Sequence, residues 1–188
     1  GLKGTSPKHL HHIYKVTWCD PLQGILSSME QSASHELPSN GLRRPLWQGK
    51  HWQKSLNTAV QHCLKLQEQK EAPRRQRRPG KRSECLQATA HALDQDVAQL
   101  IQQLEDWQVR KNRTLSRAHP LDPTGALVWI LVHVLEMSDA DRSAVQDVLL
   151  GMYTLAKDGN AELRAALLNE GCVQAVVTAT QIWTGDDF

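Results

Sequence analysis

The chain is poor in aromatic residues and has no long apolar run. Aromatics make up 5% of the 188 residues and the mean hydropathy is −0.49, which is more polar than a single compact domain usually is. No stretch approaches the roughly 18 consecutive apolar residues of a membrane helix, and the opening GLKGTSPKHLHH lacks the apolar centre of a secretory signal. We therefore expect a soluble, intracellular chain with no membrane partner, located in the cytoplasm, the nucleus or both.

Cysteine is scarce and follows no recognisable pattern. Cys19, Cys63, Cys85 and Cys172 are far apart and form no CxxC pair, unlike the cysteines of a disulfide framework or a zinc finger. The sequence also contains no phosphate-binding glycine loop, no HExxH and no nucleophile elbow. These absences predict that the protein is not an enzyme and has no cofactor.

The N-terminal region contains a histidine cluster. The run HLHH is followed by Cys19, and imidazoles together with a thiolate can bind zinc. A structural zinc site needs four ligands at regular spacing, and terminal histidines are usually solvated. We therefore predict no metal site and keep a metal-dependent enzyme as a third, weaker hypothesis, centred on His9, His11, His12 and Cys19.

The net charge of +2 hides a division of the chain. Residues 1–118 carry 19 Lys and Arg against 10 Asp and Glu, whereas residues 119–188 carry 3 against 10. The first part therefore has a balance of +9 and the second a balance of −7. Such asymmetry is typical of a chain in which one part binds an anionic partner or the two parts bind each other.

The first 69 residues change from irregular to helical character. Residues 1–46 have several turn signals and few periodic apolar positions, so we expect a mostly irregular region with one short helix near Leu22–Met29. Over residues 47–69 the apolar residues follow +4 and +3 steps from Leu56 onward. This spacing predicts an amphipathic helix.

A cationic run follows this helix. Residues 70–82, KEAPRRQRRPGKR, place two prolines, a glycine and seven cations in thirteen positions, so we expect a disordered linker. Such a run is also typical of a nuclear-import signal or a phosphate-binding patch. The residues of this candidate basic patch are Arg74, Arg75, Arg77, Arg78, Lys81 and Arg82.

A nucleic-acid-binding protein that uses residues 43–82 is the main alternative function. Trp47 and Trp52 lie among cations at the start of that region, and aromatic rings interleaved with cations can stack on bases. The same tryptophans can instead pack against a helix or bind in the groove of a partner.

Residues 83–118 predict one long helix with a heptad pattern. Ser83 is a suitable N-cap, and the acid at Glu84 interacts favourably with the helix dipole. The apolar stripe requires a second helix, which is either segment 52–69 folded back as a hairpin or a second chain. The second option predicts self-association through residues 86–107. The stripe alternates +4 and +3 steps and consists of Leu86, Ala90, Leu93, Val97, Leu100, Leu104 and Trp107.

Denser apolar runs fill the last 70 residues. GALVWILVHVL and GCVQAVVTATQ begin 46 residues apart, and self-similarity at this spacing is typical of helical solenoids. Between them, Asp139 or Asp141 is the expected N-cap of a helix that Gly159 ends in a left-handed conformation. His133, inside the first run, is expected to be a packed side chain. The apolar face of the intervening helix is predicted to contain Val145, Val148, Leu149, Met152 and Leu155.

The segment from residue 125 to 183 resembles armadillo repeats. In that family a short first helix ends on glycine, a second helix follows at once, and a longer third helix closes the unit. NAELRAALLNEG is similar to the first helix and CVQAVVTATQIW to the second, while ALVWILVHVLEMSD and the helix at about 140–157 are similar to the second and third helices of a preceding unit. The resemblance implies an all-α fold in which residues 119–188 form an armadillo-like module of about one and a half repeats.

The same resemblance indicates where a partner would bind. In importin-like arrays the third helix presents a tryptophan and an asparagine to an extended peptide, but the corresponding positions here are Leu150 and Thr154. Binding of an import signal through that ladder is therefore not expected. We instead expect a non-enzymatic scaffold or adaptor that binds an extended or helical peptide of another protein at Arg142, Gln146, Leu150, Tyr153 and Thr154.

Four residues of the armadillo-like module have predicted structural roles. Leu149 should face the interior, Leu167 should face the neighbouring unit, and Gly171 should adopt a positive φ at the corner between two helices. Arg164 is expected on an exposed or partly exposed turn, where its removal would change stability little.

Overall fold

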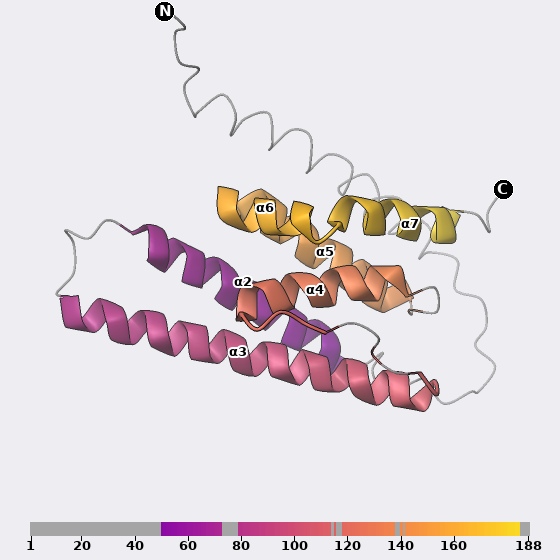
Figure 1. Cartoon of the computed structure of the whole chain (residues 1–188), viewed down its shortest axis with the longest axis horizontal. Helices are drawn as coiled ribbons and strands as arrows, with labels where there is room; N and C mark the ends of the chain where they lie inside the picture. The colour runs from indigo at the N-terminus through magenta and orange to yellow at the C-terminus, as the bar shows by residue number, and fades with distance from the viewer. Residues whose placement is uncertain are drawn as a thin grey trace, which may run out of the picture.

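The computed structural model describes residues 50–72, 79–113, 115, 118–137, 140 and 142–184, and this part of the chain contains helices and no strand (Figure 1). The predicted all-α class is thereby confirmed. The helices are α2 (Lys50–Glu71), α3 (Pro79–Arg110), α4 (Pro123–Glu136), α5 (Arg142–Asp158), α6 (Ala161–Asn169) and α7 (Cys172–Thr184). Outside the described residues lie the expectations for region 1–46, for Trp47, and for the N-caps Asp139 and Asp141.

Helices α2 and α3 form an antiparallel hairpin (Figure 1). The heptad stripe of α3 is buried from Leu93 to Trp107, and it packs against Leu56, Val60 and Cys63 of α2, which are also buried. The structure thus shows the hairpin arrangement within one chain. Self-association through residues 86–107 would have to compete with α2 for the same stripe.

The ends of α3 differ from the sequence-based boundaries. The helix begins at Pro79 rather than Ser83, because proline at the first helical position loses no hydrogen bond and has a suitable φ. It ends at Arg110 rather than near residue 118, since Asn112 adopts a φ of 54° and the Arg113 amide donates to the Gln108 carbonyl oxygen at 2.8 Å. The expected linker of residues 70–82 is therefore shorter, because both of its ends belong to helices.

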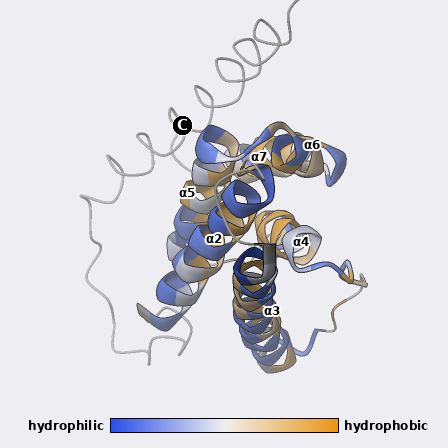
Figure 2. Ribbon diagram, turned by 90° about the vertical axis from the view of Figure 1, so that its left-hand side faces the viewer, coloured by the Kyte–Doolittle hydropathy of each residue, from blue (hydrophilic) through white to orange (hydrophobic). Residues whose placement is uncertain are grey.

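Helix α4 is the centre of the bundle. It contacts α3, α5, α6, α7 and α2, and Figure 2 shows its hydrophobic colouring between α3 below and α7 above. Its N-terminus is fixed by Asp122, whose Oδ2 accepts a hydrogen bond of 2.7 Å from the Gly125 amide. A helix that is apolar on all sides is stable only when it is surrounded, and nine consecutive or nearly consecutive residues of α4, from Ala126 to Leu135, are buried.

Helices α5, α6 and α7 follow with short connections. The predicted apolar face of α5 is buried, as are Leu149 and Leu167, each 1% exposed. Gly171 has a φ of +80°, which confirms the predicted corner between α6 and α7. No described helix has the length and apolarity required to cross a bilayer.

The prediction that Gly159 ends α5 in a left-handed conformation was wrong. Gly171 is the glycine with a positive φ among the described residues, and Gly159 is not in that region. Glycine is required at position 159 for space, because a Cβ there would collide with the Leu155 carbonyl oxygen and lie 2.7 Å from Cδ2 of Leu163. The position is a close contact between the end of α5 and the start of α6.

Candidate protein-binding surface

The five predicted partner-binding residues lie on one stripe of α5. Arg142, Gln146, Leu150 and Thr154 are spaced by four residues, and Tyr153 lies one position from the same line. Leu150 is 43% exposed and the other four are half-buried. We call this set the α5 stripe. It combines one apolar side chain, one phenol, one amide, one hydroxyl and one guanidinium, and Arg142 and Gln146 already take part in interactions within the chain.

The inner side of α5 fixes the orientation of the α5 stripe. Helix α5 packs against α2 and α4, and Gly151 lies at the contact between these three helices. A Cβ on Gly151 would be 3.4 Å from Cδ2 of Leu131 and 3.5 Å from Cγ2 of Val60, so the helices approach closely there. Leu149 and Met152 are buried on this inner side, whereas Leu150 lies on the exposed side of the helix. Tyr153 is partly buried and packs against the edge of the core.

Two local contacts shape the far end of the α5 stripe. The Thr154 hydroxyl donates to the Leu150 carbonyl oxygen at 2.8 Å, so its proton is used within α5. Nζ of Lys157 lies 5.5 Å from the centroid of the Tyr153 ring, within the range of a cation–π contact. The Tyr153 ring therefore contacts Lys157 on its own helix as well as the core.

Arg164 corrects a sequence-based expectation. Its side chain is 7% exposed, not on an exposed or partly exposed turn. Its Nη1 donates to the carbonyl oxygens of Gly159 at 2.7 Å and Ala156 at 3.3 Å, which lie at the C-terminal end of α5. Terminal helix carbonyls have no partner within their own helix, and a cation is favourable at that end of the dipole. Arg164 is a C-terminal cap for α5 supplied by α6.

Asn160 joins three helices at the same point. As the N-cap of α6, its Oδ1 accepts from the Leu163 amide at 2.9 Å. Its Nδ2 donates to Oε1 of Gln67 at 3.1 Å and to Oε1 of Glu71 at 2.7 Å, both in α2. The α5–α6 junction is therefore attached to the end of the α2–α3 hairpin.

The structure describes two residues of the candidate basic patch. Lys81 is exposed in the first turn of α3, and Arg82 is half-buried beside it. Nη2 of Arg82 donates to the carbonyl oxygens of Gln69 and Lys70, each at 3.0 Å, so this guanidinium caps the C-terminus of α2. Arg74, Arg75, Arg77 and Arg78 lie outside the described residues.

Trp52 has the packing role and not the base-stacking role. Its side chain is 3% exposed and belongs to the hydrophobic core. A ring enclosed in this way has no free face for a nucleotide base. Trp52 therefore does not support base stacking in the nucleic-acid-binding alternative.

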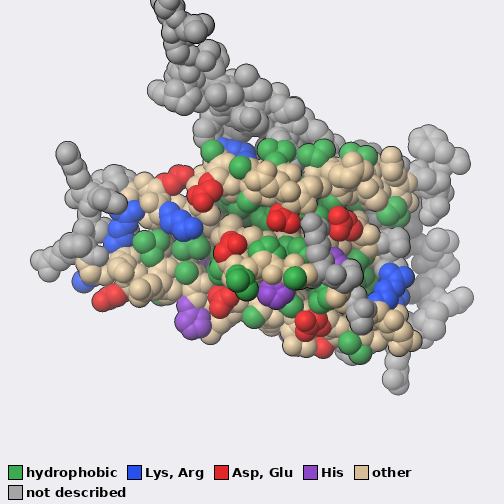
Figure 3. Space-filling view, viewed as in Figure 1, with side chains coloured by type: hydrophobic (Ala, Val, Ile, Leu, Met, Phe, Trp, Pro, Cys, Tyr) green, Lys and Arg blue, Asp and Glu red, His purple; other side chains and the backbone are tan. Residues whose placement is uncertain are grey.

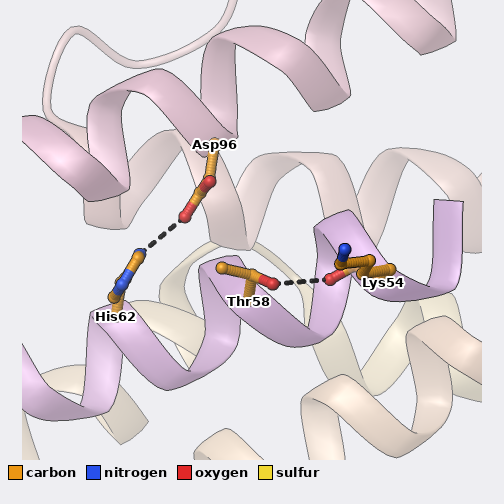
Figure 4. A network of polar contacts seen from close by, with 4 residues as sticks. All are labelled: Lys54, Thr58, His62 and Asp96. Carbon is orange, nitrogen blue, oxygen red and sulfur yellow. Dashed lines mark hydrogen bonds and ion pairs between the residues drawn. The ribbon is translucent and has the colours of Figure 1, made fainter. Parts of the chain in front are cut away.

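The hairpin also carries one polar pair between its helices. In Figure 4, His62 of α2 points toward Asp96 of α3, and Nδ1 lies 2.7 Å from Oδ2. The same view shows Thr58, one turn earlier in α2, with its hydroxyl 2.8 Å from the Lys54 carbonyl oxygen. The His62–Asp96 pair fixes the register of α2 along α3 at the edge of their apolar contact.

His133 is packed as expected. Its ring stacks on Trp129 with centroids 4.9 Å apart and an interplanar angle of 7°. The Gln108 amide nitrogen donates to His133 Nε2 at 2.9 Å, which joins α3 to α4. Among the described residues, no three His, Cys, Asp or Glu side chains are grouped so as to hold a metal ion, and His9, His11, His12 and Cys19 lie outside them.

The two buried thiols have no nucleophilic character at neutral pH. Burial raises the pKa of Cys63 to about 11 and that of Cys172 to about 12, from an ordinary value of 9.0. The Cys63 thiol lies 4.0 Å from the Thr124 hydroxyl, and Cys172 Sγ lies 3.5 Å from the Met152 sulfur. Because a thiolate is required for nucleophilic attack, these positions are packing residues.

Sequence reasoning missed a second surface, on the outer side of α7. Val173 is 50% exposed and Val177 is 43% exposed, one turn apart. Figure 3 shows hydrophobic side chains along the edge formed by α6 and α7. The signal was present in the sequence, because CVQAVVTATQIWT contains no charged residue and so lacks the polar face of an ordinary surface helix.

The chain matches no family model, no curated protein and no solved structure. The armadillo-like stacking of the module is therefore a hypothesis that rests on the residues of the α6–α7 corner and on the order of the helices around it.

Proposed function

We propose that this chain is a non-enzymatic scaffold that binds a peptide or helix of another protein along the α5 stripe. The observation that supports this most directly is the exposure of Leu150 between buried neighbours, with Leu149 at 1% and Leu150 at 43%. Burying a fully exposed leucine contributes roughly 1.5 to 3 kcal/mol, and Leu150, at 43% exposed, has part of that contribution left for a partner.

The residues around Leu150 supply what an anchor requires. Tyr153 adds apolar area at a low cost in side-chain entropy, and Gln146 and Thr154 are polar side chains on the same stripe. A central apolar contact with a polar rim is the usual anatomy of a protein interface. The rigid attachment of α5 to α2 and α4 means that little order would have to be gained on binding.

Peptides selected from a random displayed library on the full chain would test this proposal. Isothermal titration calorimetry should show that the selected peptides bind the Leu150→Asp variant at least about tenfold more weakly than the wild type. Val109→Asp is the matched control, because Val109 is 70% exposed on α3 and lies outside the α5 stripe.

Two results would contradict the proposal. One is a set of peptides whose affinity is the same for Leu150→Asp and for the control. The other is binding of a single-stranded oligonucleotide with a steep dependence on salt, of the kind that phosphate contacts produce, together with no peptide binding. The second result would favour the alternative function based on residues 43–82.

A further inference from the structure

The first turns of α3 lie outside the packed part of the hairpin. Helix α3 begins at Pro79, and in Figure 1 its start projects beyond the end of α2. Arg82 is the α3 residue whose side chain reaches the last turn of α2, and none of residues 80–84 is buried. The first fully buried side chain of this helix belongs to Thr89. This part of α3 is therefore accessible to another protein.

Ser83 lies in these turns and has an uncommitted hydroxyl group. It is exposed, and its hydroxyl forms no hydrogen bond in the described part of the chain. Threonines inside the helices differ, since Thr58, Thr154 and Thr180 each donate to the carbonyl oxygen four residues earlier. The hydroxyl of Thr89, further along α3, does the same. The Ser83 oxygen thus keeps both its proton and its lone pairs available for reaction.

Cations precede Ser83 in the sequence. Lys81 and Arg82 occupy the two positions before it, and Arg77 and Arg78 come earlier in the same run. Of the two described cations, Lys81 is exposed and Arg82 is half-buried. Protein kinases discriminate between substrates by the pattern of charge around the hydroxyl group. An exposed serine after such a run fits a kinase that selects basic sequences.

The first turn of α3 can open to admit a kinase. Protein kinases bind their substrate segment in an extended form, so this turn must unwind. Gly80 weakens the helix relative to alanine, and Pro79 has no amide hydrogen to leave without a partner. The bonds that oppose unwinding are those from Arg82 to the Gln69 and Lys70 carbonyl oxygens.

We propose that Ser83 is a phosphorylation site for a protein kinase that selects basic sequences and uses ATP. Oγ of Ser83 attacks the γ-phosphorus of ATP, the bond from that phosphorus to the bridging oxygen breaks, and ADP leaves. The hydroxyl proton passes to the catalytic base of the kinase. The product adds a charge of about −1.5 to −2 at pH 7 beside the candidate basic patch. The inference does not depend on the proposed function, because Ser83 belongs to α3 and the α5 stripe does not include it.

Phosphate transfer to the full chain by cyclic-AMP-dependent protein kinase and by protein kinase C, each with ATP, tests the proposal. Tandem mass spectrometry should locate phosphate at Ser83 in the wild type, and Ser83→Ala should lack that product. Ser143→Ala is the matched control, because Ser143 is an exposed serine of α5, and it should leave the rate at Ser83 unchanged. Phosphate found only at other hydroxyl groups would overturn the proposal.

Variants at two neighbouring positions separate charge from access. Lys81→Gln removes an exposed cation and should lower the initial rate at Ser83 at least about threefold, whereas Lys81→Arg should preserve it. Gly80→Ala leaves every charge in place, and its added Cβ would meet no atom within 4 Å. Because alanine stabilises the first turn, this variant should be phosphorylated about two- to fivefold more slowly.

Each comparison can contradict one part of the proposal. Equal rates at Ser83 in the wild type and in Lys81→Gln would overturn selection by charge. Equal rates in the wild type and in Gly80→Ala would overturn the requirement that the first turn opens. Circular dichroism of the unphosphorylated variants checks that their overall helix content is the same.

Discussion

Nη1 of Arg164 lies 2.7 Å from the carbonyl oxygen of Gly159, and this contact joins the start of α6 to the end of α5. The guanidinium is buried and also reaches the Ala156 carbonyl oxygen. One side chain therefore satisfies two terminal carbonyls that α5 cannot satisfy itself. Helices α5 and α6 are held together at this junction by a charged group inside the protein.

Removal of Arg164 should destabilise the protein. Arg164→Ala leaves the Ala156 and Gly159 carbonyl oxygens without this donor, and a hydrogen bond to a charged group contributes about 1.5 to 3 kcal/mol. The free energy of unfolding from urea denaturation should fall by about that amount. Lys65→Ala, at an exposed cation of α2, is the control and should change it by less than about 0.5 kcal/mol. Equal losses for the two variants would mean that the cap contributes nothing.

Two pairs of adjacent leucines test the direction of each helix face. Leu149 and Leu167 are each 1% exposed, whereas Leu150 and Leu168 are 43% and 38% exposed. Alanine at either buried position should cost about 2 to 5 kcal/mol through the cavity that it leaves. Alanine at either exposed neighbour should cost much less. Thermal melts of the four variants measure this. Equal melting temperatures for the buried-site and exposed-site variants of one pair would show that the buried side of that helix is assigned wrongly.

Substitution of Gly171 should act through backbone conformation alone. Its φ is +80°, yet a Cβ added there would meet no atom within 4 Å. Alanine should therefore cost about 1 to 2 kcal/mol, and the β-branched valine should cost more. Asparagine tolerates positive φ and should be the mildest of the three. Equal melting temperatures for Gly171→Val and Gly171→Asn would contradict a positive φ at the corner between α6 and α7.

The buried thiols predict a loss of stability at alkaline pH. The unfolded thiols ionise near their ordinary pKa, whereas burial holds Cys63 neutral until about pH 11 and Cys172 until about pH 12. A raised pKa in the folded state means that the stabilisation is complete below the ordinary pKa of 9.0 and is lost as the pH rises toward the folded values. Urea denaturation between about pH 8 and 10 should show this decline.

The matched variant is Cys172→Ala. It costs some packing at every pH, but the decline of stability with rising pH should be shallower than in the wild type, because one of the two thiols that ionise on unfolding is absent. An identical slope in the two proteins would refute the assignment of the decline to these thiols. Comparison of the slopes removes the contribution of groups that both proteins share.

The sequence alone determined the helical elements and which of their sides are apolar. The stripe of α3, the apolar face of α5 and the all-round apolarity of α4 follow from spacing, since a helix places residues three and four apart on one side. Gly171 was predictable for a similar reason, because one residue's backbone preference decides the corner. The common stripe of the α5 partner residues also follows from their spacing.

The tertiary structure decided which of those sides meet, and it thereby set the roles of the polar residues. Asn160 donates to Gln67, a residue 93 positions earlier in the chain, and no local pattern can indicate that bond. Arg164 and Arg82 became helix caps because neighbouring helices place unpaired carbonyls beside them. Leu150 is exposed because α2 and α4 cover the opposite side of α5. Local spacing fixes the faces of a helix, whereas the partner of each face depends on contacts between segments far apart in the chain.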